Sequence, residues 1–243
     1  MAFHTTRWSL VARAGTDDLA GRQALAELCQ AYWQPVYWLY RRLRVDPERA
    51  RDLTQGLFAH LLERGDLRRA DPQRGRFRAW LRACARHWLA DEHERERAHK
   101  RGGGAVVLSL DVAAEESRYG LQAVDHLDAE ALFERRWAQT VIERALVRLE
   151  REETTARRGA LFPHLRVVLE GEGPRRPWAD LARELDTSEG ALKVAAHRLR
   201  ARFRDCLVAE VRDTLPDDVA PGDEVNELRR SLDAGAETPR QSR

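Results

Sequence analysis

Apolar side chains recur at helical spacing along most of this sequence, while the strict alternation typical of β-strands is scarce. The first clear stripe places apolar residues three or four positions apart, as on the core-facing side of an amphipathic helix. It comprises Leu25, Leu28, Cys29, Tyr32, Trp33, Val36, Leu39, Tyr40 and Leu43. Pro35 falls inside this stripe and is expected to kink the helix. The pattern predicts an all-α fold.

Two more helices are predicted before residue 102. Asp46 and Pro47 supply a cap and a first helical residue, and Gly65 marks the stop of that helix. A loop over 70–76 leads to a third helix, which ends near the glycines at 102–104. We therefore predict an N-terminal extension over 1–19 and a helical domain over 20–101.

A second helical domain is predicted over 129–215, after a linker over 102–128 that can carry a short helix. An acidic tail follows over 216–243, with one short helix expected at 223–232. The pattern over residues 178–203 predicts two helices joined by a tight turn at Asp186, a residue type that tolerates the left-handed conformation. Thr187 or Ser188 is expected to cap the second helix. Such a short turn is typical of a helix-turn-helix motif. Its packing residues are expected to be Leu181, Leu185, Leu192, Ala196 and Leu199.

Charge is unevenly distributed, although the net charge is only +2. Residues 74–101 carry nine Lys or Arg against four acidic residues, and 174–204 carry eight against four. Residues 111–134 hold seven acidic residues and one arginine, and the chain beyond 204 is also acidic. Two basic blocks indicate two nucleic-acid-facing surfaces, or else solvated helix faces. The acidic segments are either regulatory docking surfaces or solvated spacers.

Several classes of protein are disfavoured. The sequence contains no run of about 18 apolar residues, so no membrane span is predicted. The N-terminus does not resemble a signal peptide. The three cysteines form no CxxC pair, so neither a zinc ribbon nor a disulfide framework is expected, and a cytoplasmic location fits.

The third predicted helix combines arginines with aromatic residues, a mixture suited to holding a melted DNA strand. Arginines neutralise phosphates, and aromatic faces stack on unpaired bases. The alternative is that part of the aromatic set, including Trp80, lies in the core. The second helix of the helix-turn-helix is also basic, as a major-groove reader requires, or it is the solvated face of an ordinary helical hairpin.

A rival interpretation is a metal-dependent hydrolase. Its ligands would be drawn from His87, Asp91, His93, Glu94 and His99. No HExxH or similar spacing supports it, so we expect no metal site and no catalytic residues.

Several segments together resemble one family. They are DLTQG at 52–56, FAHLLERG at 58–65, FRAWLRACARHWLADEHERERAHKR at 77–101 and the terminal helix-turn-helix. In this order they resemble the extracytoplasmic-function (ECF) sigma factors, over about residues 20–215. FHTTRWSLV at 3–11 and FERRWAQTVIERAL at 133–146 look like a subgroup with a longer linker and tail.

The resemblance implies sigma domain 2 over 20–101, sigma domain 4 over 129–215, and roles for individual residues. Those implied to bind the β′ clamp helices of RNA polymerase are Asp52, Leu53, Gln55 and Phe58. Those implied at the −10 element and in melting are Arg74, Arg76, Phe77, Arg82, Arg86 and His87. Those implied at the −35 element are Ser188, Lys193, Val194, His197, Arg198, Arg200 and Arg202. Gly56 stands where relatives usually have glutamate, and His87 where they usually have asparagine.

The function implied is that of a sigma factor, which directs core RNA polymerase to promoter DNA and assists its melting. The β flap is a second implied polymerase contact, and an anti-sigma factor is a possible further partner. No cofactor and no membrane partner are expected. The alternative is a one-component helix-turn-helix regulator that binds promoters without polymerase.

Overall fold

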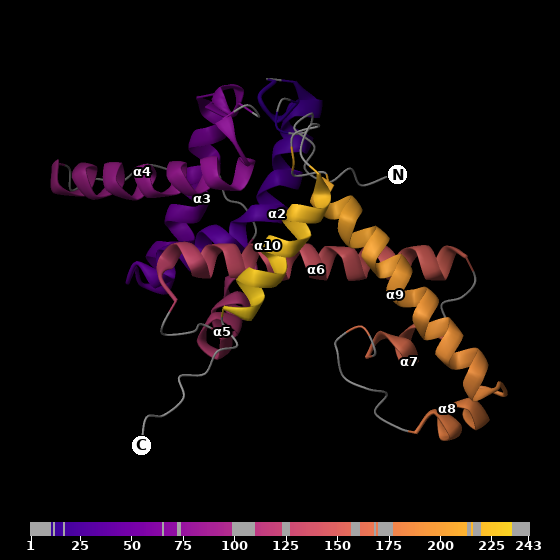
Figure 1. The fold of residues 1–243 in the computed structure, drawn as a ribbon. Coiled ribbons are helices and arrows are strands. Elements are labelled where there is room, and N and C mark those ends of the chain that lie inside the picture. The colour runs from indigo at the N-terminus through magenta and orange to yellow at the C-terminus, as the bar shows by residue number, and fades with distance from the viewer. Residues whose placement is uncertain are drawn as a thin grey trace, which may run out of the picture. The chain divides into compact units, whose positions relative to one another are not determined.

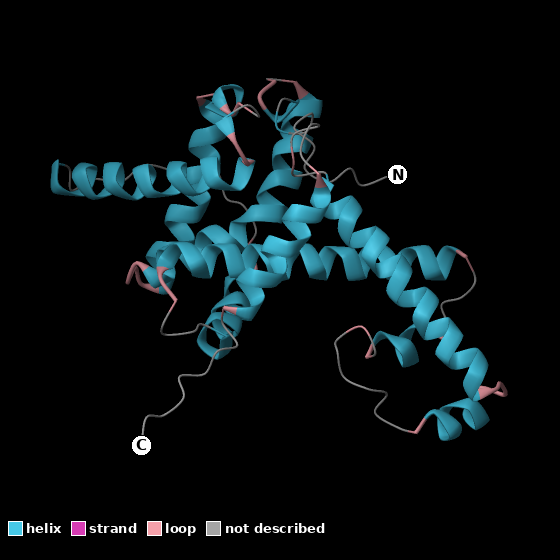
Figure 2. Ribbon diagram, viewed as in Figure 1, coloured by secondary structure: helices cyan, strands magenta, loops and turns pink. Residues whose placement is uncertain are grey.

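The computed structural model describes residues 11, 13–16, 18–64, 66–71, 74–98, 110–122, 127–156, 161–167, 169, 177–212, 215 and 220–234. Within these residues every regular element is a helix and no strand occurs (Figure 2). The predicted all-α fold is therefore confirmed. None of the described helices is both long and apolar enough to cross a lipid bilayer.

The order of the helices along the chain can be followed in Figure 1. They are α2 (Leu19–Arg42), α3 (Pro47–Glu63), the 3-10 helix η1 (Asp66–Arg69), α4 (Phe77–Ala98), α5 (Val112–Gln122), α6 (Ala129–Thr155), α7 (Phe162–Arg166), α8 (Trp178–Glu184), α9 (Glu189–Arg212) and α10 (Pro221–Asp233). The short helices expected in the linker and in the tail are confirmed as α5 and α10. The predicted stops at Gly65 and at 102–104 lie outside the described residues.

The chain forms two compact units. Unit 1 comprises Met1–Thr140 together with Val211–Arg243, and unit 2 comprises Val141–Glu210. The divisions fall inside α6 and near the end of α9, so they differ from the domain boundaries predicted from the sequence, which stay a prediction.

The core of unit 1 is centred on α2. Its residues from Val36 to Tyr40 are fully buried on every side of the helix, whereas the sequence stripe indicated one buried face. The reason is that a second layer covers the opposite face: Tyr119 of α5 packs edge-on against Trp38, with ring centroids 5.4 Å apart. On the predicted face, the hydroxyl of Tyr40 donates a hydrogen bond to the carbonyl oxygen of Ala85 in α4, at 3.0 Å.

Acidic residues hold α5 in place. Glu116 accepts hydrogen bonds from the hydroxyl of Tyr37 at 2.5 Å and from the guanidinium of Arg41 at 2.7 and 2.8 Å. Glu115 pairs with Arg136 of α6, whose nitrogen atoms lie 2.6 and 3.2 Å from the two carboxylate oxygens. Part of the predicted linker is thus folded onto α2 and α6 within unit 1.

Aspartate side chains cap the starts of α3 and α6, and the cap of α3 was predicted from the sequence. The Asp46 carboxylate accepts a hydrogen bond from the backbone N–H of Arg49 at 3.0 Å, and Pro47 is the first residue of α3. Asp128 similarly accepts from the N–H of Ala131 at 2.7 Å, which opens α6 beside α4.

Unit 2 is held together by a separate apolar cluster from α6, α7 and α9. It comprises Ala145, Leu149, Phe162, Leu165, Ala196, Leu199 and Cys206. The predicted stripe over 161–169 yields only the short helix α7, and Val168 lies outside the described residues.

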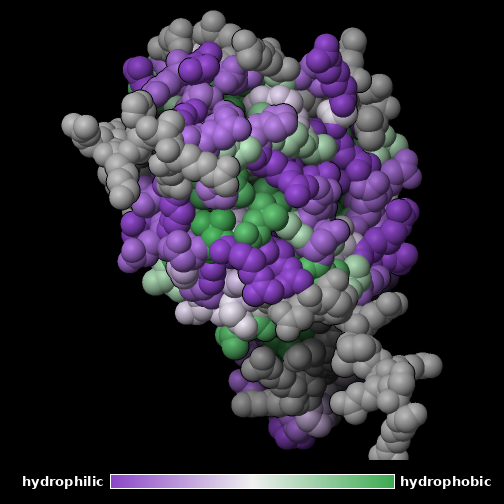
Figure 3. All heavy atoms as spheres, turned by 90° about the vertical axis from the view of Figure 1, so that its left-hand side faces the viewer, coloured by the Kyte–Doolittle hydropathy of each residue, from purple (hydrophilic) through white to green (hydrophobic). Residues whose placement is uncertain are grey.

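One face of the molecule is mostly hydrophilic, around a smaller apolar area (Figure 3). This agrees with the high content of charged residues, 34% of the sequence.

Candidate nucleic-acid interface

A row of arginines runs along α4 and the residue before it. Arg78, Arg82 and Arg86 are spaced four residues apart, so they are neighbours on one side of the helix. Arg76 precedes the helix at its N-terminal end. We call Arg76, Arg78, Arg82 and Arg86 the arginine cluster; Arg76, Arg82 and Arg86 were predicted to bind the −10 element.

The first turns of α6 present glutamates to this cluster. Glu134 lies 2.6 Å from Arg78 and 2.9 Å from Arg82. Glu130, one turn earlier, lies 3.8 Å from Arg82 and also pairs with Arg86. The two sets share a spacing of four residues, so each of these three arginines of α4 has at least one of the two glutamates of α6 as a partner.

Helix α10 brings two more glutamates to the other end of the cluster. Glu224 lies 2.8 Å from Arg76 and also pairs with Arg78, and Glu227 lies 3.0 Å from Arg78 and pairs with Arg76. The Arg78 side chain is 5% exposed and that of Glu224 is fully buried. We call Glu130, Glu134, Glu224 and Glu227 the acidic cover.

Arg78 is the centre of this arrangement. Besides its three glutamate partners, its guanidinium carbon lies 4.2 Å from the ring centroid of Trp137, an arrangement typical of a cation–π contact. Arg78 belongs to the arginines that the sequence offers for holding a melted strand, but it is not among the residues that the family resemblance implies at the −10 element, and the acidic cover was not connected with it. The spacing of Arg78, Arg82 and Arg86 was visible in the sequence, but no sequence signal identified their partners, two of which lie about 146 to 149 positions away.

The two α10 glutamates respond differently to this environment. Burial raises the pKa of Glu224 above its usual value, although Arg78 and Arg76 oppose that shift. For Glu227 burial also favours the neutral form, but the hydrogen bond and charge of Arg76 and the charge of Arg78 outweigh it and lower the pKa. Glu227 is therefore a carboxylate at neutral pH, held between two arginines.

The remaining residues predicted at the −10 element are placed differently. Arg74 and His87 are exposed. Phe77 is buried, stacked on Trp80 and edge-on to Tyr32. Its ring is part of the core of unit 1 in this structure and does not present a face for a base.

The predicted polymerase-binding residues of α3 also divide by burial. Asp52 is exposed and Gln55 is partly exposed, whereas Leu53 and Phe58 are buried in the core of unit 1. Only the first two offer side chains to a partner, since the apolar pair packs inside the domain.

Gly56 of α3 sits against the indole of Trp88 in α4. A Cβ atom at position 56 would lie 3.0 Å from the nearest ring carbon of Trp88, closer than ordinary van der Waals contact. The contact explains a glycine inside a helix, where it otherwise costs about 1 kcal/mol relative to alanine. His60 and Arg95 also pack on this indole, with 4.8 Å between ring centroids and 4.9 Å from the guanidinium carbon to the ring.

In unit 2, α8 and α9 are two consecutive helices joined by a short turn, as expected from the sequence, and their role as a DNA-binding helix-turn-helix stays a prediction. Asp186 adopts φ 48°, the left-handed conformation that the turn was expected to need. Ser188, rather than Thr187, caps α9 through its hydroxyl, which accepts a hydrogen bond from the N–H of Ala191 at 3.1 Å. Leu181 and Leu185 pack with Leu192 as predicted.

Ala196 and Leu199 were expected to pack in the same cluster, but they belong to the cluster formed with α6 and α7. Helix α8 also contacts that cluster, through Trp178, which packs against both clusters. The helix pair therefore rests on two adjacent apolar clusters.

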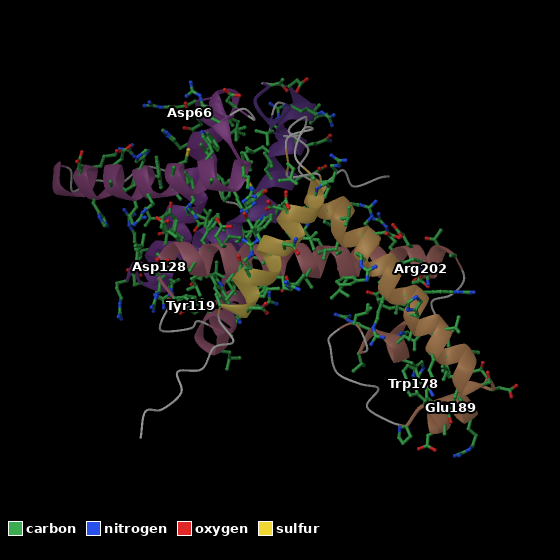
Figure 4. All side chains as sticks on the ribbon, viewed as in Figure 1. Asp66, Tyr119, Asp128, Trp178, Glu189 and Arg202 are labelled. Atoms are coloured by element: carbon green, nitrogen blue, oxygen red, sulfur yellow. The ribbon has the colours of Figure 1, made fainter. Side chains whose placement is uncertain are left out.

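Most residues predicted at the −35 element are exposed along α9. They are Ser188, Lys193, Val194, His197, Arg198 and Arg200. Lys193 pairs with Glu189 one turn earlier, at 3.2 Å. Arg202 differs, because its guanidinium is 2.8 Å from the nearly buried Glu153 of α6; Figure 4 marks Glu189 near the start of α9 and Arg202 further along it.

Metal and thiol chemistry would depend on the histidine, cysteine and carboxylate side chains of the described part of the chain. Among the described residues, no three His, Cys, Asp or Glu side chains group as metal ligands, and His99 of the hydrolase interpretation lies outside them. Burial raises the pKa of Cys29 and Cys206 to about 12 and that of Cys84 to about 11, so none of these thiols is ionised at neutral pH.

Residues 28–99 match the family model of sigma-70 region 2. This stretch contains α2 from Leu28 onward, α3, η1 and α4. The match covers less than half of the chain and shows that this stretch is similar to region 2 of the sigma-70 family, which consists of transcription initiation factors rather than enzymes. Region 2 of this family binds core RNA polymerase and promoter DNA. Neither a curated protein nor a solved structure matches the sequence.

Proposed function

We propose that the protein is an ECF-type sigma factor that directs core RNA polymerase to specific promoters and assists their melting. The observation that carries this proposal is the region 2 match over residues 28–99. It is supported by the helix pair α8 and α9 further along the chain, which we take as a helix-turn-helix with a basic second helix. A one-component regulator needs only the second of these features.

In this proposal each unit has its own contact. The exposed side chains of α3, Asp52 and Gln55, bind the β′ clamp helices. The loop before α4 and the arginines of α4 hold the unpaired strand of the −10 element, because guanidinium groups bind phosphates. Helix α9 enters the major groove at the −35 element, with Lys193 and Arg198 toward bases or phosphates.

Transcription in vitro tests the proposal. Core polymerase is combined with the purified protein and a library of promoter fragments, and we expect transcripts that start from a defined subset of fragments. DNA binding without any association with core polymerase would favour the one-component regulator instead.

The polymerase contact has its own test in a pull-down with core polymerase. Asp52→Lys is expected to weaken binding because it reverses a charge on the exposed side of α3. Asp233→Lys, at the exposed end of α10, is the matched control and should bind like the wild type. Equal retention of both folded variants would refute the α3 contact.

A further inference from the structure

The arginine cluster is the surface that the proposed function assigns to the −10 strand, yet all four of its members are paired with the acidic cover. We propose that the acidic cover, and α10 in particular, is an autoinhibitory element that occupies the DNA-melting surface of unit 1 and is displaced by the single strand. The inference rests on the proposed function and adds a regulatory step to it.

Competition for the same donors is the first argument. A guanidinium binds a carboxylate or a phosphate through the same planar set of N–H groups. Arg78 donates to Glu134 at 2.6 Å and to Glu227 at 3.0 Å, and it also pairs with Glu224. With these contacts formed, its N–H groups face carboxylates, so a DNA phosphate has to replace at least one of them.

The way in which α10 is attached is the second argument. Of the apolar side chains of α10, Leu228 is buried and Val225 and Leu232 are partly buried, so its apolar contact is small. The remaining attachment is polar: two glutamates on the arginine cluster, and the carbonyl oxygen of Leu232, which accepts a hydrogen bond from Arg135 at 2.6 Å. A helix of 13 residues is marginal by itself in water, so a polyanion that takes over the arginines removes much of what holds it.

The shape of the contact is the third argument. Beside the buried pairs lies a hollow of about 280 Å³, lined by Arg76, Arg78 and Arg82 together with Glu227 and Arg230 of α10. It gives a strand access to the edge of the cluster before α10 has moved. Displacement therefore does not require α10 to detach first.

The test is the affinity of the full chain for a short, mixed-sequence, fluorescein-labelled single strand of DNA, measured by anisotropy at low salt. Glu227→Gln removes one charge of the acidic cover and should tighten binding about threefold or more, and Glu224→Gln/Glu227→Gln about tenfold. Asp223→Asn and Asp223→Asn/Asp233→Asn remove equal charge from exposed positions of the same helix and should change the affinity less than twofold. Equal effects of cover and control variants would overturn the proposal, since net charge alone would then explain them.

Hydrogen exchange on the wild-type protein supplies a second readout that requires no substitution. Adding the single strand should accelerate amide exchange over 221–233 if α10 is displaced. Unchanged protection of that segment at saturating DNA would overturn the proposal.

Transcription assays on the same proteins separate this inference from the proposed function. Promoter-specific initiation by the wild type, with cover variants that bind the strand no better than controls, would refute autoinhibition and leave the sigma function standing. Tighter strand binding by the cover variants, without any association with core polymerase, would support masking and refute the sigma function.

Discussion

Replacing Glu115 by alanine should destabilise the protein strongly, because it leaves a charged arginine without its carboxylate inside unit 1. Arg136 is 0% exposed and Glu115 is 3% exposed, and the two are joined by bonds of 2.6 and 3.2 Å. Removing one partner of a buried ion pair typically costs about 3–5 kcal/mol, since the remaining charge has lost its solvation and its counterion. This is a large share of the roughly 5–15 kcal/mol by which domains are usually stable.

The measurement combines urea unfolding, followed by circular dichroism, with hydrogen exchange over 112–122. Exchange is included because a chain with two compact units need not unfold in a single step. Ser117→Ala on the exposed side of α5 is the control and should stay within about 0.5 kcal/mol of the wild type. The double variant Glu115→Leu/Arg136→Met should recover much of the loss, because apolar residues of similar volume replace a buried pair at little net cost.

A result in which Glu115→Ala and Ser117→Ala unfold alike, with equal exchange in α5, would refute this reasoning. It would mean that α5 is not docked on unit 1 through Glu115. A double variant as unstable as the single one would refute the narrower claim that the loss is caused by the buried charge of Arg136 without the Glu115 carboxylate.

Four further outcomes are expected. Gly56→Leu should destabilise the protein by about 1–3 kcal/mol in urea unfolding, because the larger side chain overpacks against the indole of Trp88. The control is Gly120→Leu in α5, where nothing lies within 4 Å of an added Cβ atom. Burial disfavours the Glu116 carboxylate, but its arginine and tyrosine partners on α2 lower its pKa below the usual 4.5. The stability that this carboxylate contributes is therefore present above pH 4.5 and lost as the pH falls further, so the deficit of Glu116→Gln should shrink in acid. Lys193→Ala and Arg198→Ala should each weaken binding to −35 DNA. A lost base contact should cost about 1–3 kcal/mol and relax specificity at one base position, whereas a lost phosphate contact should weaken binding to all sequences and reduce the salt dependence of binding. Wild-type affinity in both variants would mean that α9 is misassigned. His87→Asn should keep initiation but shift the preferred −10 base in a promoter library, and an unchanged preference would remove this exposed side chain from base reading.

The helices themselves were largely predictable from the sequence, because their signals are local. The cap at Asp46, the left-handed Asp186 and the serine cap of α9 depend on residues three or four positions apart. The same holds for the short helices of the linker and tail. Periodicity did less well where a helix is covered on two sides, as at Trp38 of α2, since a stripe indicates one buried face.

The candidate site was less predictable, because its arrangement depends on contacts between distant segments. Residue type and spacing placed Arg76, Arg82 and Arg86 in one predicted set, and the structure brings them together in the arginine cluster, while their role at the −10 element stays a prediction. Nothing in the spacing indicates that Glu224 and Glu227, almost 150 positions further on, lie on the same surface. Phe77 was predicted at the −10 element because it is an aromatic residue beside arginines, but it is buried, unlike the exposed Arg74 and His87. The sequence pattern does not distinguish a buried aromatic residue from an exposed one.

The energetics of these pairs favour a regulatory role for the acidic cover over a purely stabilising one. Pairs that are partly exposed, such as Arg86 with Glu130, contribute little to stability. The buried pair of Arg78 and Glu224 offers little advantage over apolar residues of the same volume, because the desolvation of both charges offsets their attraction. A chain selected only for stability has no reason to gather four glutamates from two helices onto one row of arginines. A chain that must expose those arginines when a DNA strand arrives does have a reason. DNA phosphates can replace glutamate carboxylates as partners of the arginines, whereas they cannot replace the contacts of an apolar cover.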